Sequence, residues 1–156
     1  EYFLREGKVC REIAFIEKGL LRHYYLFEGR EYNDCFCKEN SLSTSYRSLI
    51  TQAPTDFAVQ ALENTRLIIL SYDSLQKLYE KHLFWQEVGR MVSEQEYLIT
   101  EAYQRMLRNM SATDRYLHIL KQEPELLQRV PLSHLASYLQ IVPETLSRIR
   151  NKIART

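Results

Sequence analysis

The stretch PLSHLASYLQIVPETLSRIRNKI, from Pro131 to Ile153, decides how the rest of the chain is interpreted. Its first part places apolar residues at i, i+3, i+4 and i+7 spacing, which predicts a short helix with one apolar face. A turn follows at Gln140–Ile141–Val142, with Ile141 as an apolar plug, and Pro143 starts a second helix, where its missing N–H costs nothing. The apolar residues are Leu132, Leu135, Ala136 and Leu139 in the first helix, and Leu146, Ile149 and Ile153 in the second.

The second predicted helix has a polar side opposite its apolar stripe. At about 100° per residue this side carries Glu144, Arg148, Asn151 and Arg155. Ser147 lies beside them, and Thr145 and Lys152 lie on the flank. A short helix with one apolar side and such a polar side fits a recognition helix in a major groove. The alternative is an ordinary helical hairpin with a solvated face.

The charge distribution favours the first interpretation. The chain has a formal net charge of +1, and the segment 129–156 holds five of the basic residues against one acid, a net of +4. The body therefore carries about −3, and a basic end on a mildly acidic body suits attraction to a phosphate backbone. A helix C-terminus that collects cations because they favour its dipole would give the same count.

Composition limits the class of protein. The 156 residues, 45% of them hydrophobic and 26% charged, suit one or two small soluble domains. No apolar run is long enough for a membrane span and no signal-peptide pattern opens the chain, so we expect a cytoplasmic protein without membrane partners. Because Tyr2-Phe3-Leu4 already resembles a strand, we expect an N-terminal piece to be missing from this sequence.

The first half of the chain is rich in short β-type runs. They predict a sandwich or barrel, with a hairpin turn at Glu28-Gly29-Arg30 and a further hairpin at Asn64. The polar segment 38–52 predicts a loop with one helical turn around Tyr46–Ile50. The predicted strands are Val9–Cys10, Ile13–Ile16, Leu20–Phe27, Tyr32–Cys37, Phe57–Leu62 and Thr65–Tyr72.

After Tyr72 the apolar period becomes helical. Asp73-Ser74 predicts a helix N-cap, a long helix is expected over Phe84–Asn109, and the Ser111-Ala-Thr-Asp114 pattern predicts the cap of the next helix. The long helix has a heptad seam in which the polar Gln95 can fix the register of a coiled coil. The alternative partner for this helix is the barrel of its own chain. The seam consists of Val88, Val92, Gln95, Ile99, Ala102 and Met106, with Trp85 before them.

The order of a β-rich body, a long helix and a helical pair resembles the Crp/Fnr family of bacterial transcription regulators. The segments that carry the resemblance are IAFIEKGLLRHYYL with Gly19, ALENTRLIILSYDSLQKLYEKH, ATDRYLHIL and LASYLQIVPETLSRIRNKI. The resemblance implies an α+β fold: an antiparallel β-roll of the cyclic-nucleotide-binding type (a double-stranded β-helix), a long dimerisation helix and an all-α helix-turn-helix domain. The implied domains are an effector-binding roll over 1–83, the dimerisation helix over 84–110 and the DNA-binding domain over 111–156. The wing hairpin expected after the recognition helix is not present in this sequence.

The Glu144-Thr145 and Arg148 spacing is similar to the E-T-x-x-R recognition helix of that family. The resemblance implies that these three residues face base edges and that Ser133 and Lys152 contact phosphates. Arg suits guanine bidentately and Glu can accept from cytosine, so the physics agrees. The predicted DNA-binding residues are Glu144, Thr145, Ser147, Arg148, Asn151, Lys152 and Ser133.

The predicted roll departs from the family's phosphate-binding cassette, which has Gly-Glu-Leu and later Arg-Ser. Thr55-Asp56 stands in the place of the Arg-Ser pair, and an Asp there would repel a cyclic phosphate. We therefore expect an effector other than cyclic AMP, or none. The candidate pocket residues are Glu39, Asn40, Ser41, Thr55 and Asp56.

Metal and enzyme chemistry is not expected. Cys10, Cys35 and Cys37 are too few for an iron–sulfur cluster; Cys35 and Cys37 share one strand face, either as small packing residues or as a redox-sensitive pair. Of the four histidines only His23 lies in the β part, which is too few for a cupin-type metal site. Walker, dinucleotide and nucleophile-elbow motifs are absent from the sequence. We expect no catalysis, no metal and no cofactor.

The sequence thus predicts a homodimeric DNA-binding transcription regulator that binds double-stranded DNA and responds to an unidentified small-molecule effector. The alternative is a ligand-binding or protein-interaction module of the same fold that no longer reads DNA.

Overall fold

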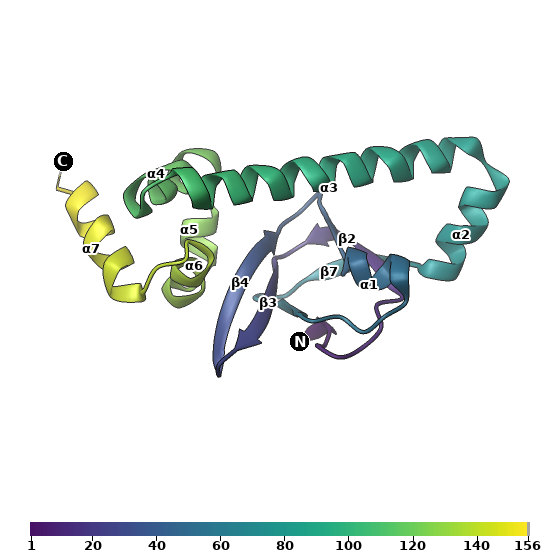
Figure 1. The fold of residues 1–156 in the computed structure, drawn as a ribbon, viewed down its shortest axis with the longest axis horizontal. Coiled ribbons are helices and arrows are strands. Elements are labelled where there is room, and N and C mark those ends of the chain that lie inside the picture. The colour runs from purple at the N-terminus through teal and green to yellow at the C-terminus, as the bar shows by residue number, and fades with distance from the viewer. Residues whose placement is uncertain (156) are drawn as a thin grey trace. The chain divides into compact units, whose positions relative to one another are not determined.

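The computed structural model describes residues 1–155. The chain divides into two compact units, Glu1–Val88 and Gly89–Thr156, which we call the roll unit and the C-terminal unit and describe separately. The fold is α+β, with antiparallel strands confined to the first unit (Figure 1). Among the helices of residues 1–155, none combines the length and the apolar character needed to cross a bilayer.

The roll unit holds two antiparallel sheets. The first has four strands in the order β1-β6-β3-β4, and the second has three in the order β5-β2-β7. One hydrophobic core takes residues from both sheets, among them Ile16 from β2 and Leu21 and Val59 from β3 and β6. The strands are β1 (Tyr2–Leu4), β2 (Glu12–Lys18), β3 (Leu21–Phe27), β4 (Arg30–Cys37), β5 (Leu42–Ser43), β6 (Ala58–Ala61) and β7 (Arg66–Ser71).

The hairpin between β3 and β4 confirms the predicted turn. Glu28 and Gly29 have φ values of 49° and 74°, and two successive positive φ angles suit a tight hairpin turn that follows the twist of the strands. The pairing runs from Phe27 with Arg30 down the two strands. The strand prediction for Val9–Cys10 is wrong, because Val9 makes only an isolated bridge, to Pro54.

The hairpin predicted at Asn64 is wrong. Strand β6 pairs with β1 and β3, whereas β7 pairs with β2 in the other sheet, so the segment between them crosses from sheet to sheet. Residue Gly19 marks a second crossing, between β2 and β3. It has a φ of +107°, and a Cβ there would lie 2.7 Å from Cα of Thr65, so the two crossings pack against each other where only glycine fits.

Two helices complete the roll unit before the long helix begins. Helix α1 (Tyr46–Thr51) is the helical turn expected in the polar segment. Helix α2 (Tyr72–Lys81) begins earlier than predicted, because its N-cap is Ser71, whose hydroxyl accepts a hydrogen bond from the Ser74 N–H, and not Asp73-Ser74. Asp73 instead lies in the first turn, where a carboxylate favours the helix dipole.

Helix α3 (Leu83–Asn109) is the long helix, and it begins one residue before the predicted start. It continues into the C-terminal unit, where α4 (Ala112–Gln122) begins at the predicted cap: the Ser111 hydroxyl accepts from the Asp114 N–H at 3.2 Å. Three further helices follow: α5 (Leu126–Arg129), α6 (Leu132–Tyr138) and α7 (Pro143–Ile153).

The core of the C-terminal unit lies between α4, α5, α6 and α7. Helix α7 packs on both α6 and α4. The predicted apolar faces are buried at Leu135, Ala136, Leu139 and Leu146, each at most 1% exposed, and Ile149 is 9% exposed. The pair of helices expected between Pro131 and Ile153 is therefore present and firmly packed.

Candidate nucleic-acid interface and roll interior

The turn between α6 and α7 holds the two helices in a fixed arrangement. Gln140 adopts a left-handed conformation with φ 52°, at the position where motifs of this kind usually carry glycine. The Ile141 N–H donates to the Ala136 carbonyl at 3.0 Å, and Pro143 occupies the first turn of α7. The polar side chains of α7 are therefore presented by a rigid support.

The predicted DNA-facing residues lie together on the outer side of this support. Four of them on α7 are exposed, as is Ser133 on α6, whereas Thr145 and Ser147 are half-buried at the edge of the packed face. The guanidinium of Arg148 donates from Nη2 to the Thr145 hydroxyl at 3.0 Å, which holds the arginine along the helix surface. Glu144, Arg148, Asn151 and Lys152 are the exposed members on α7.

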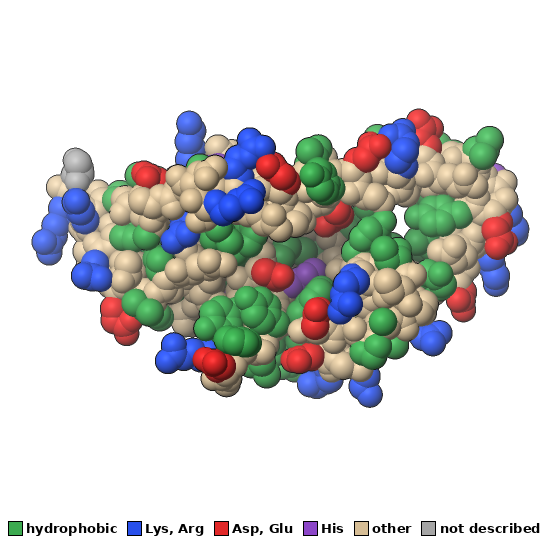
Figure 2. All heavy atoms as spheres, viewed as in Figure 1, with side chains coloured by type: hydrophobic (Ala, Val, Ile, Leu, Met, Phe, Trp, Pro, Cys, Tyr) green, Lys and Arg blue, Asp and Glu red, His purple; other side chains and the backbone are tan. Residues whose placement is uncertain are grey.

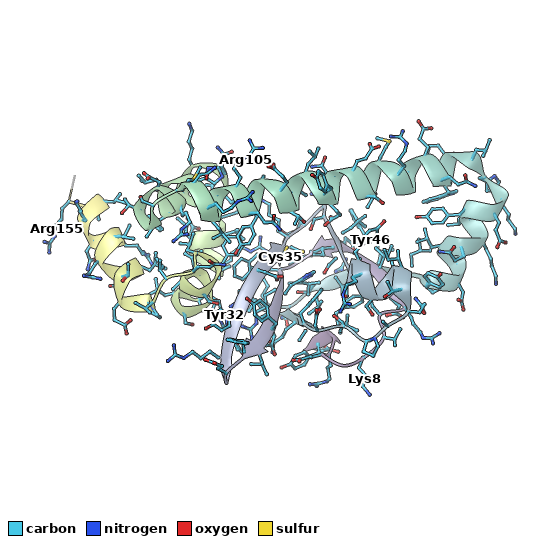
Figure 3. The ribbon with its side chains drawn as sticks, viewed as in Figure 1. Lys8, Tyr32, Cys35, Tyr46, Arg105 and Arg155 are labelled. Atoms are coloured by element: carbon cyan, nitrogen blue, oxygen red, sulfur yellow. The ribbon has the colours of Figure 1, made fainter. Side chains whose placement is uncertain are left out.

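Cations dominate this surface. The last turn of α7 carries Arg150 and Lys152, and Glu144 is the acid in its first turn. Lys and Arg side chains gather along the outer side of α7 in the space-filling view (Figure 2). Arg155 extends outward from the end of the helix (Figure 3). Such a surface attracts a polyanion, and its arginines can also donate in pairs to a base edge.

The long helix presents the middle of its predicted seam to solvent. Gln95, Ile99 and Ala102 are exposed and Val88 and Val92 are half-buried, whereas Met106 is buried within the single chain. Ile99 is 51% exposed and the neighbouring Leu98 is 57% exposed, so the chain itself leaves apolar surface uncovered on this part of α3.

The predicted pocket residues are used in contacts of the roll itself. Glu39 accepts a hydrogen bond from the Gly19 N–H at 2.8 Å, and the Ser41 hydroxyl donates to the Lys38 carbonyl at 2.6 Å. Asn40 stands between them with φ 64°, in a tight turn against the end of β2.

The other two predicted pocket residues lie beside α1. The Thr55 hydroxyl is buried and bonds that of Ser45 at 2.9 Å, while Asp56 is exposed and pairs with Arg47 at 3.2 Å. Two hollows of about 550 and 680 Å³ open at the N-terminal strand. In the described part of the chain, the residues that line these two hollows do not include any of the five predicted pocket residues.

The roll interior brings together a polar cluster that the sequence did not predict. His23 on β3 is 8% exposed, and its Nε2 lies 2.8 Å from the Ser43 hydroxyl and 3.6 Å from the Cys37 sulfur. The sulfurs of Cys35 and Cys37 are 3.5 Å apart, which confirms that they share one strand face. Among the described residues, no three His, Cys, Asp or Glu side chains are grouped so that they could hold a metal ion.

A β-bulge explains why this cluster could not be read from the hairpin. Counting back from the turn, Tyr24 pairs with Asn33, and an unbroken ladder would next pair His23 with Asp34. The register shifts there, so Asp34 is left over and His23 pairs with Cys35. The sequence predicts the alternation of side chains along the strands and the hairpin turn, but it does not predict the extra residue in β4.

Comparison with known proteins identifies the fold. No protein-family model matches the chain, and no curated protein matches it by sequence. Among solved structures, FixK2 from Bradyrhizobium japonicum superposes with a TM-score of 0.85 at 18% identity, over 99% of this chain and 80% of that one. The c-di-GMP responsive global regulator CLP from Xanthomonas campestris gives 0.72 at 20% identity, over 99% and 83%.

A third similar structure is assigned to the crp/fnr family of transcriptional regulators and comes from Eubacterium rectale. It gives a TM-score of 0.74 at 13% identity, over 97% of this chain and 76% of that one. The match extends over almost the whole chain in all three cases, so the likeness of fold to these structures includes both units.

Proposed function

We propose that this protein is a DNA-binding transcription regulator of the Crp/Fnr type that acts as a homodimer. The observation that carries the proposal is the two-sided character of α7: Leu146 and Ile149 are packed inward, while Glu144, Arg148 and Asn151 are exposed together on the other side. A helix fixed on one side and polar on the other can enter a major groove without rearrangement.

The chemistry of the exposed side matches base and phosphate recognition. Arg148 can donate two hydrogen bonds to O6 and N7 of guanine, and Glu144 can accept from N4 of cytosine. Lys152 and Ser133, which flank that side, would contact phosphates and set the position of the helix on the duplex. The likeness of fold to transcription regulators along the whole chain supports the same assignment.

The proposed dimer forms along α3. Its seam would use the exposed Ile99 and Ala102, the half-buried Val88 and Val92 toward the start of the helix, and Gln95 between these two pairs. Two copies paired along this helix would present two recognition helices to half-sites about one turn of DNA apart. The roll over 1–83 would act as the sensory part, the helix over 84–110 as the connection and 111–156 as the DNA-binding domain.

The effector is proposed not to be cyclic AMP. The acid Asp56 pairs with Arg47 near the place where the family's arginine would hold the phosphate, and an added phosphate would have to break that pair. Calorimetry with cyclic AMP, cyclic GMP and cyclic di-GMP tests this directly. Micromolar binding of cyclic AMP or cyclic GMP would overturn it.

The decisive experiment is DNA binding by the full chain and two matched variants. Fluorescence anisotropy with the DNA upstream of the protein's own gene should show specific binding that exceeds binding to scrambled DNA. Arg148→Ala removes one bidentate base contact from each protomer of the proposed dimer, so specific binding should weaken roughly a hundredfold or more. Arg105→Ala is the control, because Arg105 is an exposed arginine of the same unit that pairs with Glu101 on α3.

Two results would reject the proposal. One is equal affinity of the parent protein for promoter and scrambled DNA, which would favour the ligand-binding or protein-interaction alternative. The other is unchanged specific binding by Arg148→Ala, which would show that another surface reads the DNA.

A further inference from the structure

The roll contains two thiols in contact with each other and with a buried imidazole. Sγ of Cys35 lies 3.5 Å from Sγ of Cys37, and Sγ of Cys37 lies 3.6 Å from Nε2 of His23. The same Nε2 also lies 2.8 Å from the hydroxyl of Ser43 on β5, and the Phe57 ring stacks on the imidazole with centroids 5.2 Å apart. The three reactive groups therefore have fixed relative positions.

We propose that Cys35 and Cys37 form a reversible dithiol oxidation site that reacts with hydroperoxides. In this site the His23 imidazole holds the proton that the Cys37 thiol gives up. The chemistry is measured on the protein alone, so the proposal does not rest on DNA binding.

The two thiols have different environments. Cys37 is 8% exposed and belongs to the roll core, whereas Cys35 on the same strand is half-buried. The hydrogen bond from Cys35 lowers the pKa of Cys37 well below the usual thiol value, and the nearby His23 and Ser43 lower it further, against the effect of burial. The thiolate is the reactive form, so Cys37 is the nucleophile and Cys35 the resolving thiol.

The reaction balances with hydroperoxide as the oxidant. The Cys37 thiolate attacks one peroxide oxygen, the O–O bond breaks, and the departing hydroxide takes the proton from the His23 imidazolium to leave as water. Cys37 is then a sulfenic acid. The Cys35 thiol attacks that sulfur, the S–O bond breaks, and the second hydroxide leaves as water with the Cys35 proton. Peroxide is reduced to two waters and the two thiols are oxidised to one disulfide.

Formation of this bond requires a local movement of β4. Residues two apart on a regular strand have Cα atoms about 6.7 Å apart, at the upper end of the range for disulfides, and their Cβ atoms are about as far apart, beyond the roughly 3.5–4.5 Å that a disulfide spans. The sulfurs must move from 3.5 Å to about 2.05 Å, and the bulge at Asp34, next to Cys35, gives this part of β4 an irregular ladder that can adjust. A stretched bond of this kind is readily reduced, so the site is reversible.

The third thiol supplies an internal control. Cys10 is 1% exposed, and its sulfur contacts the Glu12 carbonyl at 3.3 Å and the Thr44 hydroxyl at 3.2 Å, away from any other cysteine. It shares the core with Cys37 but has neither a neighbouring thiol nor an imidazole among these contacts.

The test treats the reduced full chain with hydrogen peroxide, alkylates the remaining thiols and maps the peptides by mass spectrometry. We expect Cys35 and Cys37 to escape alkylation together as an internal disulfide that dithiothreitol reverses. Cys10 should stay reduced and alkylatable, and peroxide should oxidise it at least roughly tenfold more slowly, because among the described residues its sulfur contacts only the Glu12 carbonyl and the Thr44 hydroxyl and has no second thiol to resolve it. Equal oxidation of the three cysteines, or no internal disulfide, would overturn the proposal.

Single variants assign the roles. Cys35→Ser should stop at a Cys37 sulfenic acid that dimedone traps, and Cys37→Ser should lose the fast reaction. Cys10→Ser should leave both steps unchanged. His23→Gln should move the pH midpoint of Cys37 alkylation upward, an effect that a purely structural role would not produce. Fast peroxide reaction in Cys37→Ser would reject Cys37 as the nucleophile, and an unchanged midpoint in a folded His23→Gln protein would reject the proton-holding role.

Discussion

The phenol of Tyr103 on α3 donates a hydrogen bond of 2.8 Å to the backbone carbonyl of Tyr138 at the end of α6, and the two rings stack with centroids 4.9 Å apart. Both residues belong to the C-terminal unit. The contact ties the later part of the long helix to the helix pair, so this part of α3 and the proposed DNA-reading surface move together as one body.

Removing the Tyr103 hydroxyl should therefore destabilise the C-terminal unit. Tyr103→Phe keeps the stacked ring and loses the hydrogen bond, for an expected loss of about 1 kcal/mol in the free energy of unfolding. Tyr103→Ala loses both contacts and should lose roughly 2–3 kcal/mol. Denaturant unfolding followed by far-UV circular dichroism measures both. Tyr97→Phe is the control, because Tyr97 is 69% exposed on the same helix; an equal effect of the two Phe variants would contradict the assigned contact.

Gly19 should tolerate no side chain. A Cβ there would meet the backbone of Thr65 at 2.7 Å while φ stays at +107°, so Gly19→Ala combines backbone strain with a clash at the point where the chain crosses twice between sheets. We expect a loss on the order of 3 kcal/mol. Thermal unfolding of Gly7→Ala is the matched comparison, since Gly7 has φ +78° and nothing within 4 Å of its Cβ position. Its loss should be only about 1 kcal/mol, and similar losses for both variants would show that the clash is relieved.

The same region explains where sequence reasoning failed. Local signals were reliable: the Ser111 cap, the Glu28–Gly29 turn and the α6–α7 pair follow from residues within a few positions of one another. The chain at Gly19 and at Asn64 carries equally good turn signals, yet both segments cross between sheets. A turn residue permits a reversal but does not say which strand the chain will pair with next.

The candidate sites divide in the same way. The polar side of α7 follows from helical periodicity, so its residues could be predicted and are found together. The His23–Cys35–Cys37 cluster depends on one extra residue at Asp34. The pattern of apolar and polar residues along a strand does not predict such a bulge. The prediction of Glu39 and Asp56 as pocket residues rests on their place in the resemblance to the family. In the folded chain Glu39 instead accepts a hydrogen bond from the Gly19 N–H, and Asp56 pairs with Arg47.

A phosphate contact by Lys152 would appear in the salt dependence of DNA binding. Because the proposed dimer carries two copies of Lys152, their loss removes two phosphate contacts, which should reduce the slope of log K against log salt by about 1.8 and weaken binding to all sequences equally. Lys152→Gln should show this change in anisotropy titrations at several salt concentrations. Lys121→Gln, an exposed lysine in the last turn of α4, should keep the parent slope. A change of sequence preference in Lys152→Gln would instead indicate a base contact.

The proposed dimer makes the most direct prediction about α3. Ile99 is 51% exposed in the single chain, and a symmetric seam would bring it against its own copy. Ile99→Lys would place two ammonium groups in that seam, so the dimer dissociation constant should rise roughly a hundredfold, or about 3 kcal/mol. Sedimentation velocity across a concentration series measures it. Tyr97→Lys is the matched control, because Tyr97 is also exposed on α3 but is two residues from Ile99, on the side away from the seam. If Tyr97→Lys dissociated the dimer and Ile99→Lys did not, the dimer contact would lie on the opposite face of the helix. A parent protein that stays monomeric at high concentration would exclude the α3 dimer.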